Sequence, residues 1–107
     1  MRGSTRCRAA LVAMAALMPV PGFAAGDAAA GKVAADHWCA NCHVVAAAGG
    51  QGSDAVPTFS SIAADPKKTD DYLRSFLADP RHPMPNLQLS RQEIENLVAY
   101  IASLRPH

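Results

Sequence analysis

The clearest helical pattern of apolar residues lies at the C-terminal end of the chain. Its apolar positions recur at intervals of three and four residues, as positions on one face of a helix do: Ile94, Leu97, Val98, Ile101 and Leu104. Ser90 stands just before this pattern and Glu93 follows it three residues later, an arrangement typical of a capping box. The pattern therefore predicts a helix from about Arg91 to Leu104.

A second helical pattern begins at Thr69, which has the hydroxyl that favours the first position before a helix. Two aspartates follow it, where negative charge stabilises a first turn. Three apolar residues then share one face: Leu73, Phe76 and Leu77. We expect this helix to end before Pro80, because proline cannot continue a helix.

An alanine-rich stretch, residues 27 to 38, contains no proline and predicts a short helix that runs into a pair of cysteines. Gly31 lies inside it at a cost of about 1 kcal/mol, so we expect this glycine to pack closely against another element. Residues 44 to 66 are rich in glycine, show little periodicity and are predicted to form a loop. The prolines of residues 80 to 86 predict a stiff extended loop. Since no alternating strand pattern occurs, we predict an all-α fold.

The N-terminal end has the layout of a secretory signal peptide. Three arginines precede an apolar run over residues 9 to 20, and proline, glycine and small residues follow. A membrane span is the competing interpretation, but the run is shorter than the roughly 20 residues needed to cross a bilayer. We therefore predict that residues 1–24 are a cleaved signal peptide and that residues 25–107 form the mature domain in the periplasm.

Length and charge limit how many domains the mature chain can form and which partners it can bind. The chain has 107 residues, half of them hydrophobic, which leaves room for one small domain and no separate catalytic domain. Three of the ten basic residues belong to the predicted signal peptide, so seven basic and nine acidic residues give a net charge of −2 without histidine. No basic stripe indicates binding to nucleic acid. A domain of this size usually depends on a disulfide, a metal or a cofactor.

The sequence WCANCH contains Cys39, Cys42 and His43 in the spacing by which c-type haem is attached. Each thiol adds across one haem vinyl group, and the following histidine falls beneath the iron. A thioredoxin-like redox pair would need a βαβ context that is missing, and a zinc site would have only His37 as a fourth ligand on the same turn. A structural disulfide would leave His43 unexplained. We expect one covalently bound haem c.

Met84 is the methionine that remains after removal of residues 1–24, and it is the candidate for the second axial ligand of the iron. Pro83 and Pro85 hold its backbone extended, which lowers the entropy lost on ligation. Filling a gap in the core is the alternative role of such a methionine. With His43 and Met84 both on the iron, no position is open for oxygen or substrate, which favours electron transfer over catalysis. Of the other histidines of the mature domain, His37 and His82 are expected to face solvent, and His107 is expected to be mobile at the terminus.

Two segments, WCANCH and HPMPNLQLSRQEIENLVAYIASL, give the chain a resemblance to the class I c-type cytochromes, in particular the small monohaem kind that bacteria export to the periplasm. The similarity spans about residues 28 to 104. It implies three to four helices wrapped around the haem. It also implies that Gly31 packs against an aromatic of the last helix, Tyr100, and that the carbonyl of Pro57 orients the haem histidine.

The resemblance implies a periplasmic single-electron carrier and not an enzyme. Its redox partners would be a dehydrogenase or quinol-oxidising complex as donor and an oxidase or reductase as acceptor. A haem-bearing subunit docked to one oxidoreductase is the first alternative, and a haem protein that binds a gas or peroxide after Met84 dissociates is the second. We expect a monomer with no membrane insertion of the mature chain. Ten apolar residues are candidates for the core around the haem: Val33, Phe59, Ile62, Leu73, Phe76, Leu77, Leu87, Leu97, Tyr100 and Ile101.

Overall fold

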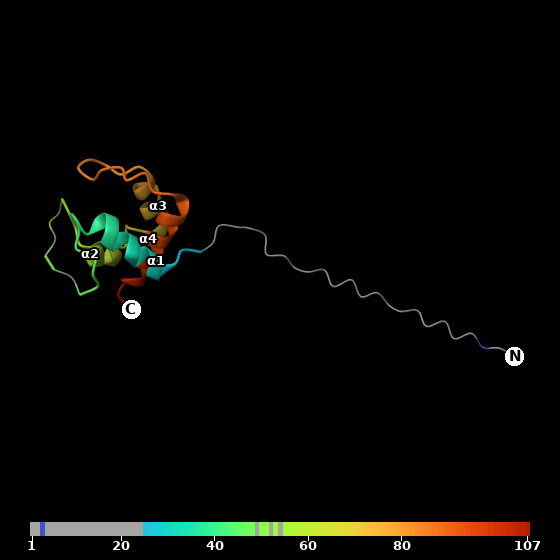
Figure 1. Ribbon diagram of the computed structural model, residues 1–107. Helices are drawn as coiled ribbons and strands as arrows, with labels where there is room; N and C mark the ends of the chain where they lie inside the picture. The colour runs from blue at the N-terminus through green and yellow to red at the C-terminus, as the bar shows by residue number, and fades with distance from the viewer. Residues whose placement is uncertain (1–2, 4–24, 49, 52, 54) are drawn as a thin grey trace.

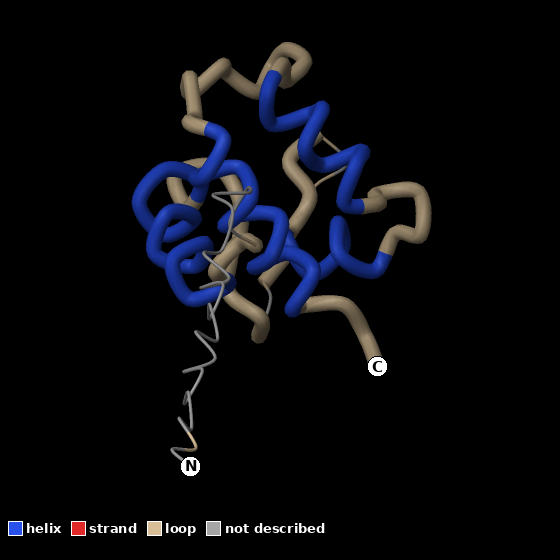
Figure 2. Tube along the Cα trace, turned by 90° about the vertical axis from the view of Figure 1, so that its right-hand side faces the viewer, coloured by secondary structure: helices blue, strands red, loops and turns tan. Residues whose placement is uncertain are grey.

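The computed structural model describes Gly3 and residues 25–48, 50, 51, 53 and 55–107. The predicted signal peptide, apart from Gly3, lies outside these residues. The described elements are α1 (Ala28–Ala34), the π-helical turn η1 (Ala35–Cys39), α2 (Phe59–Ala64), α3 (Asp70–Ala78) and α4 (Arg91–Ser103). The described part of the chain contains helices and loops and no strand, which confirms the all-α prediction (Figure 2). None of its helices is long and apolar enough to cross a membrane.

Helix α4 is the element against which the other helices pack. Figure 1 shows α1 lying against it, and α2 and α3 also contact it. At Gly31 the two backbones approach so closely that an added Cβ would lie 1.9 Å from the carbonyl oxygen of Asn96 and 2.8 Å from the Cβ of Tyr100. The predicted close packing of Gly31 against Tyr100 is therefore confirmed, and the absence of a side chain is what permits it.

The prediction that Val33 belongs to the core is wrong, because 69% of its surface is exposed. Helix α1 buries the face that carries Gly31, and Ala35 continues that face with no exposed surface. Two residues along a helix correspond to a rotation of about 200°. Val33 therefore lies on the opposite side of α1 from Gly31 and faces solvent.

The helix predicted over residues 27 to 38 changes its hydrogen bonding at η1. The N–H of Ala40 donates to the carbonyl oxygen of Ala35, five residues back, at 3.0 Å. The N–H groups of Cys42 and His43 then both donate to the carbonyl oxygen of Cys39, at 3.1 and 2.9 Å. This hydrogen bonding folds the two cysteines and the histidine into one tight turn at the end of η1.

Helix α2 corrects the prediction that all of residues 44 to 66 form a loop. Thr58 begins this helix, since its hydroxyl accepts a hydrogen bond from the N–H of Ser61 at 3.1 Å. Phe59 and Ala63 are buried, and the N–H of Phe59 donates to the carbonyl oxygen of Val44 at 2.9 Å. The helix has six residues. That length is too short for a periodic pattern to stand out, so packing against the core decides its formation.

The boundaries predicted for the two longer helices are confirmed. The hydroxyl of Thr69 accepts a hydrogen bond from Tyr72 at the start of α3, and α3 ends before Pro80. At the start of α4, the N–H of Glu93 donates to the Ser90 hydroxyl at 3.1 Å, and the N–H of Ser90 donates to the Glu93 carboxylate at 2.7 Å. This is the predicted capping box.

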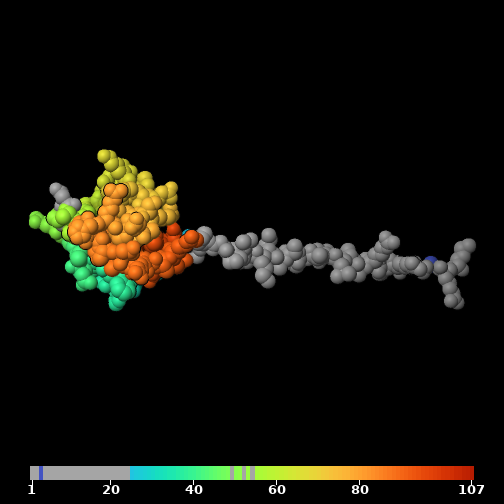
Figure 3. All heavy atoms as spheres, turned by 90° about the horizontal axis from the view of Figure 1, so that it is seen from above, coloured from blue at the N-terminus to red at the C-terminus, as the bar shows by residue number. Residues whose placement is uncertain are grey.

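The segment between α3 and α4 is a loop, as its prolines predict. In the space-filling view it forms the orange part of the surface, beside the yellow part that contains α3 (Figure 3). The loop approaches the core through two partly buried side chains, Met84 and Leu89. It therefore covers one side of the space between the helices.

Candidate functional site

A cavity of about 440 Å³ lies between η1, the helices α2, α3 and α4, and the loop that contains Met84. Its volume falls in the range of about 300 to 1,000 Å³ that is usual for cofactor and ligand sites. Eight of the apolar residues predicted to surround a haem line it: Phe59, Ile62, Leu73, Phe76, Leu77, Leu87, Leu97 and Ile101. Tyr100 is buried next to the cavity lining, with its ring centroid 6.3 Å from that of Phe59. The site is thus mainly apolar.

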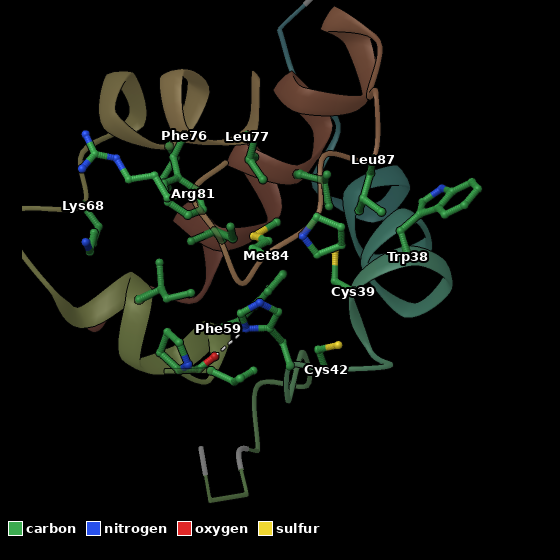
Figure 4. Close-up of a pocket in the computed structure, with 18 of the residues that line it drawn as sticks. Trp38, Cys39, Cys42, Phe59, Lys68, Phe76, Leu77, Arg81, Met84 and Leu87 are labelled. Atoms are coloured by element: carbon green, nitrogen blue, oxygen red, sulfur yellow. Dashed lines mark hydrogen bonds between the residues drawn. The ribbon is translucent and has the colours of Figure 1, made fainter. Parts of the chain in front are cut away.

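The two thiols lie on one side of the cavity (Figure 4). Cys39 is buried, Cys42 is exposed, and neither is part of a disulfide. Burial raises the pKa of the Cys39 thiol. A redox-active cysteine pair needs the opposite, a thiol with a lowered pKa, so the surroundings of Cys39 disfavour the thioredoxin-like alternative.

His43 is held in a defined orientation beside the thiols. Its Nδ1 lies 2.7 Å from the carbonyl oxygen of Pro57, an interaction marked by the dashed line in Figure 4. Because a carbonyl oxygen only accepts, Nδ1 carries the proton and donates it. The lone pair of the ring is therefore left on Nε2, where a metal can bind. The ring also packs beside Phe59, with 5.5 Å between the ring centroids.

Met84 reaches the cavity from the loop between α3 and α4. It is half-buried and packs against the hydrophobic core. Its N–H donates to the carbonyl oxygen of Arg81 at 3.0 Å, which closes a turn at this point of the loop. Figure 4 shows its sulfur pointing into the middle of the cavity. Pro83 and Pro85, on either side of it, line the same cavity.

His37 and His82 are exposed, as expected, and the terminal His107 is exposed too. His37 packs edge-on against Trp38, with 4.6 Å between the ring centroids. His82, which belongs to the loop that contains Met84, also borders the cavity. Within the described residues, no three side chains of His, Cys, Asp or Glu come together as ligands for a metal ion.

The donor set of this cavity fits an iron porphyrin. Its walls are mainly apolar, as a flat macrocycle requires, and the two thiols that line it are the groups to which haem vinyls can be joined. An imidazole with its proton fixed on Nδ1 and a thioether are both ligands of haem iron in proteins. The residues that would hold the group are therefore Cys39, Cys42, His43 and Met84.

Comparison with known proteins agrees with this geometry. Residues 26–101 match the family model described as "Cytochrome C oxidase, cbb3-type, subunit III". The chain belongs to this family of c-type cytochromes. Membership implies that the cytochrome has haem c, with its iron, as cofactor and that it transfers electrons together with redox partner proteins. The resemblance to a small c-type cytochrome seen in the sequence is thereby confirmed.

Two curated relatives support the assignment. The cytochrome is 46% identical over 82 residues to cytochrome c-552 of Bradyrhizobium diazoefficiens, a match that covers 77% of this chain and 79% of that protein. It is 37% identical over 94 residues to cytochrome c-554(547) of Halothiobacillus neapolitanus, which covers 76% of this chain and all of that protein. No solved structure shows a significant match to the chain.

The polar part of the cavity lining was not predicted from the sequence. Lys68, Tyr72 and Arg81 border the cavity, although none of them belongs to a motif. Lys68 precedes α3, Tyr72 lies in its first turn and Arg81 follows its end. No local pattern indicated that these residues face the site, because only the folding of α3 against the core brings them there.

Proposed function

We propose that this cytochrome is a periplasmic carrier of single electrons with one haem c. The thiols of Cys39 and Cys42 would bind it covalently, and His43 and Met84 would be the protein ligands of its iron. The observation that supports this proposal best is the convergence of both thiols, the Nε2 lone pair and a thioether on a single apolar cavity. When bound, the haem iron supplies the one-electron chemistry by changing between its ferric and ferrous states.

The surrounding residues tune this chemistry in two ways. The hydrogen bond from His43 to Pro57 fixes the orientation of the ring and makes Nε2 of the imidazole a better electron-pair donor to a metal. A thioether as the second axial ligand favours the reduced iron more than a second imidazole would. The apolar walls from α2, α3 and α4 exclude water and so also help set the potential. We therefore expect a potential above that of a cytochrome with two histidine ligands.

The exposure of Cys42 indicates where a partner protein approaches. Cys39 is buried, whereas Cys42 lies at the surface on the edge of the cavity. A partner that docks over this edge comes close to the cofactor without opening the fold. The exposure of Cys42 therefore favours electron transfer at the protein surface. It gives no reason to expect a channel that would lead a substrate to the iron.

A dedicated subunit is the second candidate function, because the matching family model is named after an oxidase subunit. The relative from Halothiobacillus, however, is covered over its whole length by the match, so that protein consists of little besides such a domain. Gel filtration of the native periplasmic fraction distinguishes the two. A carrier elutes at the size of one mature chain, and a subunit elutes with its enzyme.

Absorption spectra of the purified protein test the ligation. We expect the ferric form to show the weak charge-transfer band that reports sulfur on iron, and the ferrous form to bind carbon monoxide slowly or not at all. Fast binding of carbon monoxide without the sulfur band would contradict the proposal. That result would favour the alternative in which the iron binds a gas or peroxide.

A further inference from the structure

The apolar cavity has one cationic region that the described residues do not neutralise. Lys68 and Arg81 line the cavity, and no described Asp or Glu does. The four ion pairs of the described residues lie elsewhere and involve other cations: Lys32, Arg74 and Arg105. Lys68 is half-buried, where an unpaired ammonium group is costly. This region is therefore suited to an anion.

Three side chains there offer hydrogen-bond donors. The Nζ of Lys68 donates to the hydroxyl of Tyr72 at 2.9 Å and lies 4.2 Å from the centre of the tyrosine ring. Because Tyr72 accepts from Lys68, its own O–H is free to donate further. Lys68 retains two more N–H groups, and the guanidinium of Arg81 presents a planar set of donors that matches a carboxylate.

The position of these donors relative to the thiols decides which anion they fit. In Figure 4, Lys68 and Arg81 lie on one side of Met84, and Cys39 and Cys42 lie on the other. Haem has two carboxylate side chains, on the edge of the macrocycle away from its two vinyl groups. A haem attached through Cys39 and Cys42 would direct those carboxylates toward Lys68 and Arg81.

We propose that Lys68 and Arg81, with Tyr72, bind the two carboxylates of the haem. This inference depends on the covalent haem proposed above. In the inferred role these residues are positioning residues. They offset the cost of placing carboxylates beside an apolar cavity, and they keep the carboxylates ionised. A constant negative charge next to the iron makes the potential independent of pH over a wide range.

The test measures the midpoint potential as a function of pH in holoprotein. The variants are Lys68→Gln and Arg81→Gln, with Lys67→Gln as the matched control, because Lys67 is exposed and does not line the cavity. Each protein is first shown to contain covalent haem by its mass. Besides Lys68 and Arg81, five titratable side chains line this cavity, of which the two thiols would be thioethers in holoprotein: Cys39, Cys42, His43, Tyr72 and His82. None of these five groups is substituted in any variant, and Arg81→Gln also leaves the hydrogen bond from Lys68 to Tyr72 in place.

Protonation of a haem carboxylate removes a negative charge and raises the potential as the pH falls. A cation within about 4 to 6 Å lowers the pKa of a carboxyl group by about 1 to 3 units, and exposure to solvent reduces this effect. In a plot of midpoint potential against pH, this titration gives a step. We expect Lys68→Gln to raise the pH of the step by about one unit, and Arg81→Gln to raise it by less. At neutral pH both variants should have a lower potential than the Lys67→Gln control, since the positive charge that they lose lines the cavity and that of Lys67 does not.

The inference would be overturned if both variants had the same pH of the step and the same midpoint potential as Lys67→Gln. That result would leave the proposal of a covalent haem in place. Lys68→Arg and Arg81→Lys keep the charge and should retain the wild-type step. Arg81 is exposed, so Arg81→Gln decides the question even if Lys68→Gln does not mature. Wild-type protein without covalent haem would instead contradict the proposed function, a result that its mass reveals before any titration.

Discussion

At the scale of single residues, a short turn determines most of the chemistry of this cytochrome. The sequence alone is enough to propose Cys39, Cys42 and His43 as the residues that hold haem, because their spacing is that of the c-type attachment motif. Pro57 required the family resemblance, since the contact between its carbonyl and His43 joins positions 14 residues apart. Lys68 and Arg81 were not predicted, because a solvated surface charge and a charge facing a cavity look the same in a sequence.

Met84 gives the most direct prediction at this scale. Met84→Ala removes the thioether and leaves one axial position of the iron without a protein ligand. We expect the ferric sulfur band to disappear, the potential to fall and the ferrous protein to bind carbon monoxide quickly. Leu87→Ala is the control, because Leu87 lines the same cavity without a ligating atom. Equal spectra for Met84→Ala and wild type would show that Met84 only fills space.

Tyr100 provides a second prediction, about stability. Its buried hydroxyl donates to the carbonyl oxygen of Val45 at 2.5 Å. Tyr100→Phe leaves that carbonyl without this donor, and we expect a loss of about 1 to 3 kcal/mol in the free energy of unfolding. Ser60→Ala is the control, since it removes an exposed hydroxyl bond of 3.3 Å to Ala47. Denaturant titration should show a loss below about 0.5 kcal/mol for the control. Equal losses in the two variants would contradict the special role of the buried bond.

At the scale of elements, the long capped helices could be predicted and the short irregular ones could not. Helices α3 and α4 have both periodic apolar residues and capping side chains, so pattern and local chemistry agree. Helix α2 and the π-helical turn η1 have six and five residues, and tertiary contacts decide their conformation. The error at Val33 has a similar origin: an apolar residue in an alanine-rich helix does not reveal which side faces the core.

The crossing of α1 and α4 leads to a prediction at Gly31. Gly31→Ala places a Cβ 1.9 Å from the carbonyl oxygen of Asn96, and backbone atoms at that position have little room to move. The two helices must separate, and we expect a loss of at least about 1 to 3 kcal/mol in the free energy of unfolding. The control on the same helix is Val33→Ala, which removes an exposed side chain and should change stability by no more than about 0.5 kcal/mol.

Denaturant titration of the two variants in holoprotein measures both effects. A Gly31→Ala protein as stable as Val33→Ala would mean that α1 and α4 tolerate a wider separation. The close approach of their backbones would then not be required for the fold.

At the scale of the whole molecule, the proposed haem would form part of the core. The helices enclose a cavity of about 440 Å³ whose walls come from η1, α2, α3 and α4 and from the loop around Met84. In a domain this small, such a space removes a large share of the apolar contacts that a packed core would provide. A group that binds the folded state and not the unfolded state stabilises the fold, so we expect the stability of this domain to depend on the proposed haem.

The paired substitution Cys39→Ser with Cys42→Ser tests this dependence. Without attachment of haem, we expect the helical signal in far-UV circular dichroism to fall strongly and the cooperative thermal transition to be lost. Lys67→Gln, made and matured in the same way, should keep both. A doubly substituted protein with the helicity and melting temperature of the control would show that the polypeptide folds without its cofactor.

We propose that an exported form of this chain has one porphyrin bound through two thioethers. The most direct test of this proposal is the intact mass of protein purified from a host that exports and matures such cytochromes. We predict the mass of a chain that begins near Ala25 plus one haem, in a coloured protein that keeps this mass after denaturation. A colourless product with the mass of the bare polypeptide would contradict the account.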